Sequence, residues 1–177
     1  TRWLSDWSSD VCSSDLIDNA SEWLEDLLFK GVQYDMVISN PPYKKLNKDS
    51  NESVTMKSIV FGQPNIYYLF MAMAAKLLKD DGQLIFITPR SFCTGEYFKV
   101  FRKWFLNNVK IERIHIFESR DKTFNSEVLQ ETIILKAIKT KTKKSFIDIS
   151  NSSDSRLCKE DINICKFMYD RVIEPND

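Results

Sequence analysis

The amino-acid sequence predicts an α/β domain with a mainly parallel sheet and right-handed crossovers. The first observation is that apolar runs of strand length alternate along the chain with segments of helical periodicity. The second is that these runs are almost continuously apolar, as expected for strands covered on both faces. The third is that 177 residues with 43% hydrophobic and 12% aromatic content can bury a core. We therefore expect a globular domain and exclude a disordered linker.

The first half of the chain is expected to contain two helices and a buried strand. Residues 21–29 carry apolar side chains at helical spacing and predict a short helix. Residues 34–39 form an apolar run that ends abruptly at two prolines, which is typical of a buried strand. The polar stretch 44–62 predicts a long loop, and loops of that length are usually functional or mobile. Residues 65–79 predict an amphipathic helix that stops before Gly82.

The second half continues the alternation and then changes in composition. We expect, in order, a strand at 84–87, a helix at 95–107, strands at 111–117, 128–138 and 146–149, and a helix at 159–171. After residue 138 the chain becomes rich in lysine, serine, asparagine and aspartate. We therefore place a boundary there and interpret residues 139–177 as a linker and the truncated start of another module.

Residues 1–16 are expected not to belong to the domain. They contain short serine-rich repeats without a helical or strand period, and residues 6–16 resemble the translation of a short-read sequencing adapter. We interpret residues 1–16 as a non-native leader that replaces the true upstream sequence, and start the domain at residue 17. The alternative is a natural, flexible, serine-rich leader.

Charge and cysteine content limit the kinds of binding site that we expect in this chain. Lysine plus arginine and aspartate plus glutamate each total 25, so affinity for nucleic acid must come from local patches. The four cysteines form no C-x-x-C pair and His115 is the sole histidine, so we expect no metal site and interpret His115 as structural. No apolar run approaches the roughly 20 residues of a membrane span. The expected location is the cytoplasm, with free thiols.

The segment Asn40-Pro41-Pro42-Tyr43 is the feature that indicates chemistry. It follows a buried strand, and ligands in open α/β sheets bind beyond such strand ends. The prolines fix two φ angles and remove two donors, so the loop is rigid and presents acceptors. The Asn40 amide oxygen and the Pro41 carbonyl can accept the two hydrogens of an exocyclic amino group, and Tyr43 can stack on a flat base. The alternative is an ordinary proline-stiffened turn.

Three blocks resemble those of a known enzyme family. Residues 34–43, YDMVISNPPY, are similar to the catalytic block of amino-group methyltransferases. Residues 66–70 and 81–92 resemble blocks of N6-adenine DNA methyltransferases from restriction-modification systems, in the subgroup whose recognition domain follows the catalytic domain. The similarity covers about residues 18–138. It implies that residues 17–138 form part of a Rossmann-like S-adenosylmethionine-dependent sheet with helices on both faces, and that residues 139–177 begin a target-recognition module.

The resemblance also implies an activity, namely site-specific transfer of a methyl group from S-adenosylmethionine to N6 of adenine in duplex DNA. The adenine is flipped out of the duplex in that family. Its N6 lone pair is delocalised into the ring, so two acceptors must draw the amino group toward tetrahedral geometry before it can attack a methyl group. A restriction or specificity partner belongs to such systems, and its identity stays open.

The family's roles carry over to individual positions. Asn40, Pro41 and Pro42 would form the catalytic loop, with Asn40 and Pro41 as the amino-group acceptors. Tyr43 and Phe124 would stack on opposite faces of the base, and Asp18 would contact the cofactor. Phe61 and Tyr67 are further candidates for the pocket wall. Three basic residues after the loop are candidates for contacts with DNA phosphates, the alternative being a solvated loop: Lys44, Lys45 and Lys48.

The chain departs from the family in one respect. The family has a Phe-x-Gly-x-Gly turn after its first strand, and none of the four glycines here lies in that pattern. We therefore expect this chain by itself to lack most of the site for the cofactor's methionine and ribose. Two alternatives stay open: a protein-glutamine or RNA methyltransferase with the same loop, and a noncatalytic DNA-binding or assembly remnant.

Overall fold

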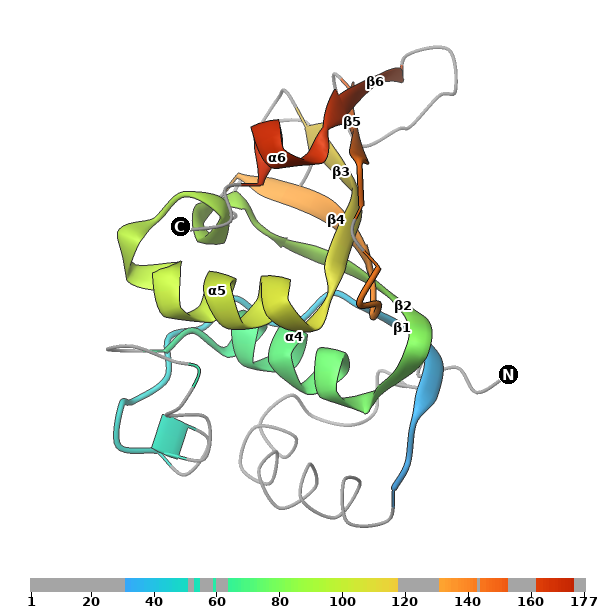
Figure 1. Cartoon of the computed structure of the whole chain (residues 1–177). Coiled ribbons are helices and arrows are strands. Elements are labelled where there is room, and N and C mark those ends of the chain that lie inside the picture. Colours follow the sequence, from blue (N-terminus) through green and yellow to red (C-terminus); the bar gives the residue numbers. More distant parts are fainter. Residues whose placement is uncertain are drawn as a thin grey trace.

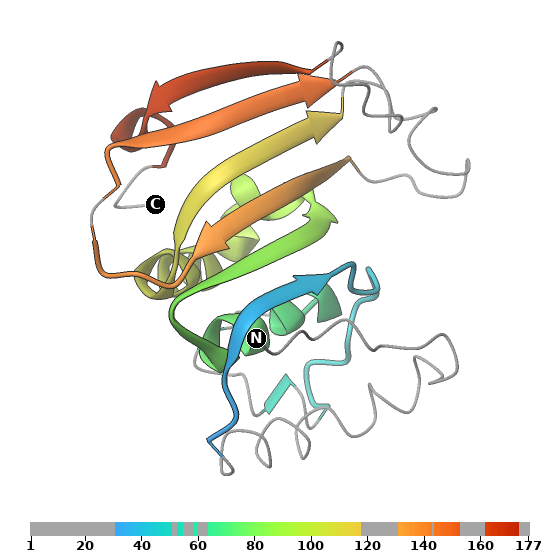
Figure 2. The same cartoon turned by 90° about the vertical axis from the view of Figure 1, so that its right-hand side faces the viewer.

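The fold is a single mixed β-sheet with helices packed against it. The computed structural model describes residues 31–50, 53–54, 59, 64–117, 131–142, 144–152 and 162–173. Its strands are β1 (Tyr34–Ser39), β2 (Leu78–Pro89), β3 (Lys110–Phe117), β4 (Thr132–Ile138), β5 (Phe146–Ser152) and β6 (Asn163–Met168). They form one six-stranded sheet in the order β1-β2-β4-β3-β5-β6, which Figure 2 shows face-on. The expected helix at 21–29 lies outside the described residues.

The strand directions correct the expectation of a mainly parallel sheet. Two of the five pairings are parallel, β1 with β2 and β3 with β5, and the other three are antiparallel. The main cause is β4, which follows β3 in the chain but inserts between β2 and β3 and pairs antiparallel with both. Apolar runs of strand length carry no information on strand direction, so the sequence did not reveal this insertion.

The helices that the structure describes lie on one side of the sheet. These are α4 (Ile66–Leu77), α5 (Lys99–Asn108) and the short α6 (Tyr169–Val172), with 3₁₀ turns η1 (Arg90–Cys93) and η2 (Glu96–Phe98) leading into α5. Figures 1 and 2 show α4 and α5 side by side against the same face. Cover of the other face by helices stays a prediction, because the helix expected at 21–29 is not among the described residues.

The turn from α4 into β2 is tighter than expected. The helix ends at Leu77 and β2 begins at the next residue, so the strand includes the Asp81-Gly82 pair that was expected to separate the two elements. Asp81 has a positive φ of 61°, and the register with β1 shifts in this region. A Cβ at Gly82 would lie 2.9 Å from the Lys79 carbonyl oxygen. Glycine is therefore required here by the close approach of backbone.

The core lies between the sheet and the helices α4 and α5. Ten of the twelve residues of α4 are buried. Beneath it, every second side chain of β2 and β4 points toward the helices, as the two-residue repeat of a strand requires. These residues are 0 to 1% exposed: Leu84, Phe86, Ile133, Leu135 and Ala137. The site described below is therefore supported by a tightly packed core.

The C-terminal segment corrects a second expectation. The helix predicted at 159–171 is instead strand β6 followed by the single-turn helix α6. β6 pairs antiparallel with β5 along its length, and this ladder satisfies backbone groups that a helix would have satisfied internally. The strands on both sides of residue 139 share one sheet, although the boundary itself stays a prediction. Among the described residues, no helix is long and apolar enough to cross a membrane.

Candidate active site

Two loops meet at one edge of the sheet. β1 and β2 are parallel neighbours, so their carboxyl ends lie side by side. Asn40, Pro41, Pro42 and Tyr43 follow β1, and the turn η1 follows β2. This edge is where open α/β sheets bind ligands.

The Asn40–Tyr43 loop places a polar acceptor at the surface. Pro41 is buried, Asn40 and Pro42 are exposed, and Tyr43 is half-buried. The Tyr43 hydroxyl donates a hydrogen bond to Asn40 Oδ1 over 3.1 Å. Burial raises the pKa of Tyr43 to about 12, so the phenol is protonated at neutral pH and able to donate. The buried proline anchors the loop while the asparagine remains accessible to a ligand.

Backbone hydrogen bonds fasten the end of this loop to the start of α4. The Ile66 amide donates to the Lys44 carbonyl over 2.8 Å, and the Leu46 amide donates to the Pro64 carbonyl over 2.7 Å. Asn65 pairs with Lys45 as an isolated bridge and also caps α4. The position of the loop is therefore set by the helix as well as by the prolines.

Tyr67 on α4 lies directly behind the loop. Its ring centroid is 6.1 Å from that of Tyr43 and the two planes are nearly perpendicular, at 85°. Tyr67 is only 1% exposed, and burial raises its pKa, which the nearby Ser91 side chain partly offsets. Its hydroxyl is buried without a hydrogen bond of ordinary length and angle to any described residue. The loop thus rests on an aromatic side chain of the core.

The structure places some of the predicted site residues and not others. It brings Asn40, Pro41, Pro42, Tyr43 and Tyr67 together at the sheet edge. The lysines that follow the loop are exposed, and the described residues show no ion pair for them: Lys44, Lys45 and Lys48. The candidates for the cofactor contact, the second stacking ring and part of the pocket wall lie outside the described residues: Asp18, Phe124 and Phe61.

Arg102 is a structural residue of this edge that the sequence prediction missed. It is 5% exposed and donates from Nη1 to the carbonyl oxygens of Phe92, over 3.2 Å, and Gly95, over 2.6 Å. The guanidinium therefore braces the loop that follows β2. An arginine flanked by Phe101 and Phe105 on the apolar side of the predicted helix was the available signal.

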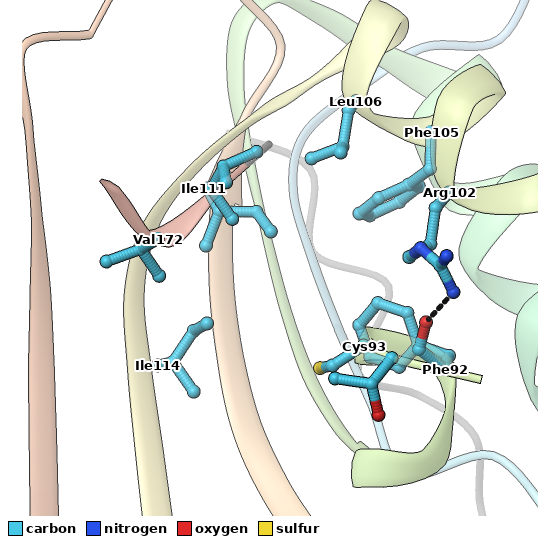
Figure 3. Close-up of a pocket in the computed structure, with 10 residues that line it drawn as sticks. Phe92, Cys93, Arg102, Phe105, Leu106, Ile111, Ile114 and Val172 are labelled. Carbon is cyan, nitrogen blue, oxygen red and sulfur yellow. Dashed lines mark hydrogen bonds between the residues drawn. The ribbon is translucent and has the colours of Figure 1, made fainter. Parts of the chain in front are cut away.

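A cavity of about 320 Å³ lies beside Arg102, between α5, β3 and α6 (Figure 3). Its lining is largely apolar and includes Phe105, Ile114 and Val172. Cys93 also lines it, and burial raises the pKa of that thiol to about 11, although Arg90 and Arg102 oppose the rise. The thiol is therefore protonated at neutral pH. The Asn40–Tyr43 loop does not contribute to the cavity.

The described residues supply a hydrogen-bond acceptor and an aromatic ring at the sheet edge, but no glycine-rich turn. The acceptor is the Asn40 amide oxygen and the ring is that of Tyr43. Of the glycines, Gly82 lies in β2, Gly95 precedes η2 and Gly31 precedes β1, so none of these forms a glycine-rich turn after a strand. Within the described ranges, no group of three or more His, Cys, Asp or Glu side chains is arranged to hold a metal ion.

Comparison with known proteins relates this arrangement to one group of enzymes. Residues 5–124 match the family model described as Eco57I restriction-modification methylase. The chain is 37% identical to the type II methyltransferase M.BsuBI of Bacillus subtilis, in an alignment that covers 95% of this chain and 35% of that protein. It is 35% identical to the type II methyltransferase M.PstI of Providencia stuartii, in an alignment that covers 97% of this chain and 33% of that protein. The chain thus spans about a third of the length of these curated relatives.

Solved structures show the same fold. The type IIG restriction endonuclease BpuSI superposes with a TM-score of 0.63 at 18% identity, over 84% of this chain and 20% of that one. A putative class I S-adenosylmethionine-dependent methyltransferase from Listeria monocytogenes superposes with a TM-score of 0.58 at 23% identity, over 71% of this chain and 38% of that one. These likenesses concern the fold of the sheet and its helices.

Proposed function

The chain belongs to the Eco57I restriction-modification methylase family, and from this premise we propose that it carries the amino-group-binding part of an adenine-specific DNA methyltransferase. The reaction is transfer of a methyl group from S-adenosylmethionine to N6 of adenine in duplex DNA, within a restriction-modification system. The relatives M.BsuBI and M.PstI, which carry the name type II methyltransferase, support this reaction class.

The observation that carries the proposal is the exposed Asn40 oxygen beside the Tyr43 ring, at the sheet edge beyond β1. Asn40 Oδ1 has two lone pairs, and the Tyr43 hydroxyl occupies one of them. The other can accept an N–H of the target amino group, and the Pro41 carbonyl is proposed to accept the second. Fixed acceptors at this position would raise the nucleophilicity of N6 without a dedicated base.

The residues of this chain therefore act on the base. When bound, S-adenosylmethionine would supply the methyl group, whose bond to sulfur breaks as its bond to N6 forms. Asn40 and Pro41 orient the amino group, Tyr43 stacks on the flipped adenine, and one N6 proton is released to solvent as the new N–C bond forms. Three exposed lysines that follow the loop are proposed to contact DNA phosphates: Lys44, Lys45 and Lys48.

Two further residues, the location of the protein and its protein partner belong to the same proposal. Asp18 would contact the cofactor, and Phe124 would stack on the second face of the base. We also propose that the protein acts in the cytoplasm and that a restriction or specificity subunit is its protein partner. The alternatives are a protein-glutamine or RNA methyltransferase and a noncatalytic remnant, and the missing glycine-rich turn supports the latter for this chain alone.

The test uses a chimera, because the chain spans about a third of its relatives. The segment that aligns with this chain is replaced in M.BsuBI by residues 17–177, and transfer of a labelled methyl group is measured on duplex DNA, RNA and a glutamine-containing peptide. We expect methylation of adenine in duplex DNA. Asn40→Ala should lower the rate at least about 100-fold, as loss of a fixed transition-state hydrogen bond does, with cofactor affinity nearly unchanged.

Asn47→Ala is the matched control, because Asn47 is an exposed asparagine shortly after the loop. Among the described residues, its side chain accepts a local hydrogen bond from the Asp49 amide. This variant should methylate at the unsubstituted rate. The proposal is wrong if Asn40→Ala also methylates at that rate, or if a folded, cofactor-binding chimera methylates RNA or peptide in place of DNA. A folded chimera that binds cofactor and methylates nothing would favour the noncatalytic remnant.

A further inference from the structure

We propose that Tyr67 is a positioning residue for the amino-group site, because its ring fixes the orientation of the Tyr43 ring and, through it, the Tyr43–Asn40 hydrogen bond. The inference rests on the proposed function, in which Asn40 accepts an N–H of the target adenine. Tyr67 itself would touch neither the base nor the cofactor.

The three side chains form a continuous series of contacts. The Tyr67 ring meets the Tyr43 ring edge-on at 6.1 Å, within the range that aromatic pairs prefer. The Tyr43 hydroxyl in turn donates to Asn40 Oδ1 over 3.1 Å. A swing of the Tyr43 side chain about its Cα–Cβ bond, which the Tyr67 ring opposes, would therefore move the hydroxyl away from the Asn40 oxygen.

Tyr67 is held by several contacts besides the one with Tyr43. Asn65 caps the first turn of α4 by accepting a hydrogen bond from the Tyr67 amide. The Tyr67 ring also packs against Tyr68 at 5.5 Å and Phe98 at 6.1 Å, and the side chain is 1% exposed. Tyr43, by contrast, is only half-buried. The buried Tyr67 ring is thus held in place by the core, whereas the half-buried Tyr43 ring depends on its contact with Tyr67.

The hydroxyl of Tyr67 does not explain why a tyrosine is found here. It is buried and makes no hydrogen bond of ordinary geometry with any described residue. The hydroxyl takes no part in the contact with Tyr43, so the ring is the part of the side chain that positions the loop. Tyr67→Phe therefore separates the two parts, because it keeps the ring and removes the hydroxyl.

Tyr68 provides a matched control on the same helix. It is also a buried tyrosine, 2% exposed, and its ring packs against Phe98 at 5.6 Å and Phe101 at 5.1 Å. Among the described rings, Tyr43 is paired with Tyr67 and not with Tyr68. Truncation of Tyr68 should therefore loosen the core without altering the loop.

The experiment follows the Asn40 side-chain amide and the Tyr43 ring by NMR in the full 177-residue chain. Tyr43→Phe, which lacks the hydroxyl, gives the Asn40 signal without the hydrogen bond. We expect Tyr67→Leu to move the Asn40 amide signal toward that reference and to weaken the nuclear Overhauser contacts between the Tyr43 ring and the Asn40 side chain. Tyr67→Phe and Tyr68→Leu should leave both as in the unsubstituted chain. Tyr67→Met, whose flexible side chain can fill an irregular gap, replaces Tyr67→Leu if the latter does not fold.

A second measurement connects the geometry to the reaction in the chimera described above. Tyr67→Leu should raise the KM for duplex DNA by about 2- to 10-fold, the equivalent of one aromatic pair, with a smaller change in kcat. An unchanged Asn40 signal with unchanged Overhauser contacts to Tyr43 in Tyr67→Leu overturns the inference, as does an equal change in Tyr68→Leu or in Tyr67→Phe. If instead Asn40→Ala methylates normally, the proposed function fails, whatever the NMR signals show.

Discussion

Two buried regions of the molecule are stabilised in different ways. One is the aromatic cluster between α4 and α5, which consists of Tyr67, Tyr68, Phe92, Phe98, Phe101 and Phe105. The other is the polar seam between β3 and β5, which consists of His115, Ser150 and Ser152. The stability of the aromatic cluster depends on close packing of its rings, whereas the stability of the polar seam depends on its buried hydrogen bonds.

The aromatic cluster is a chain of ring contacts around Phe101. Phe101 lies 5.1 Å from Tyr68, 6.2 Å from Phe92 and 5.4 Å from Phe105, and is 2% exposed. Through Tyr68 and then Tyr67, the cluster reaches the loop that carries Asn40. Tyr67 is therefore the member of the cluster that contacts the candidate site, whereas the other rings support the fold.

The polar seam joins two parallel strands through one histidine. His115 Nδ1 lies 2.9 Å from Ser150 Oγ, and Nε2 lies 3.0 Å from Ser152 Oγ. All three residues are buried, at 3 to 7% exposure. A neutral imidazole can donate from one nitrogen and accept at the other, while each hydroxyl turns to match it. Both ring nitrogens of His115 can thus form hydrogen bonds while the imidazole is neutral.

The largest effect should come from emptying the aromatic cluster. Phe101→Ala removes a ring that is packed on several sides, and we expect it to lower the free energy of unfolding by about 3 to 5 kcal/mol. The control is Phe146→Ala in β5, where the ring is 54% exposed. That change should stay within about 0.5 kcal/mol. Chemical denaturation of the two variants measures both, and equal losses would contradict the assignment of the core to the helix side.

A smaller effect should follow from breaking the polar seam. Ser150→Ala removes the hydroxyl that faces His115 Nδ1 and leaves a buried ring nitrogen without that partner. We expect a loss of about 1 to 3 kcal/mol in the free energy of unfolding, the usual consequence of an unsatisfied buried polar group. The same denaturation experiment tests this, with Ser145→Ala as an exposed serine control. No loss in Ser150→Ala would mean that the hydrogen bond adds nothing to stability.

The smallest effect should be a change in pH dependence. Burial lowers the pKa of His115 in the folded chain below its ordinary value of about 6.5. The unfolded chain therefore binds the proton first, so the histidine's contribution to stability is complete above about pH 6.5 and decreases as the pH falls below it. His115→Gln should flatten the stability curve between about pH 7 and pH 5 relative to the unsubstituted chain. Parallel curves for the two proteins would show that His115 titrates alike in both states.

Glu112 also has a shifted pKa, but it does not affect the difference in pH dependence between His115→Gln and the unsubstituted chain. Partial burial raises its pKa, but hydrogen bonds from Lys144 and Lys136 outweigh this and leave the pKa below its ordinary value. As a carboxylate with a lowered pKa, it stabilises the fold above the unfolded value, and this contribution is lost only at more acidic pH. Because it is present in both proteins, its contribution cancels in the difference between the two curves.

The sequence by itself determined the local features of the fold and of the candidate site. The strand before Asn40, the helix over residues 66–77 and the strand over 110–117 are confirmed, because each depends on a local repeat of apolar residues. The rigidity of the Asn40–Tyr43 loop and its place after a buried strand also follow from consecutive residues.

Only the tertiary structure decided the features that depend on residues far apart in the chain. These are the insertion of β4 between β2 and β3, the pairing of β6 with β5 in place of a helix, the contact of Tyr67 with Tyr43, and the partners of His115. A periodic pattern gives the face that a side chain occupies on its own element, but not the element that faces it. His115 had no visible partner in the sequence because its serines lie 35 and 37 residues further along the chain, and only the pairing of β3 with β5 brings them together.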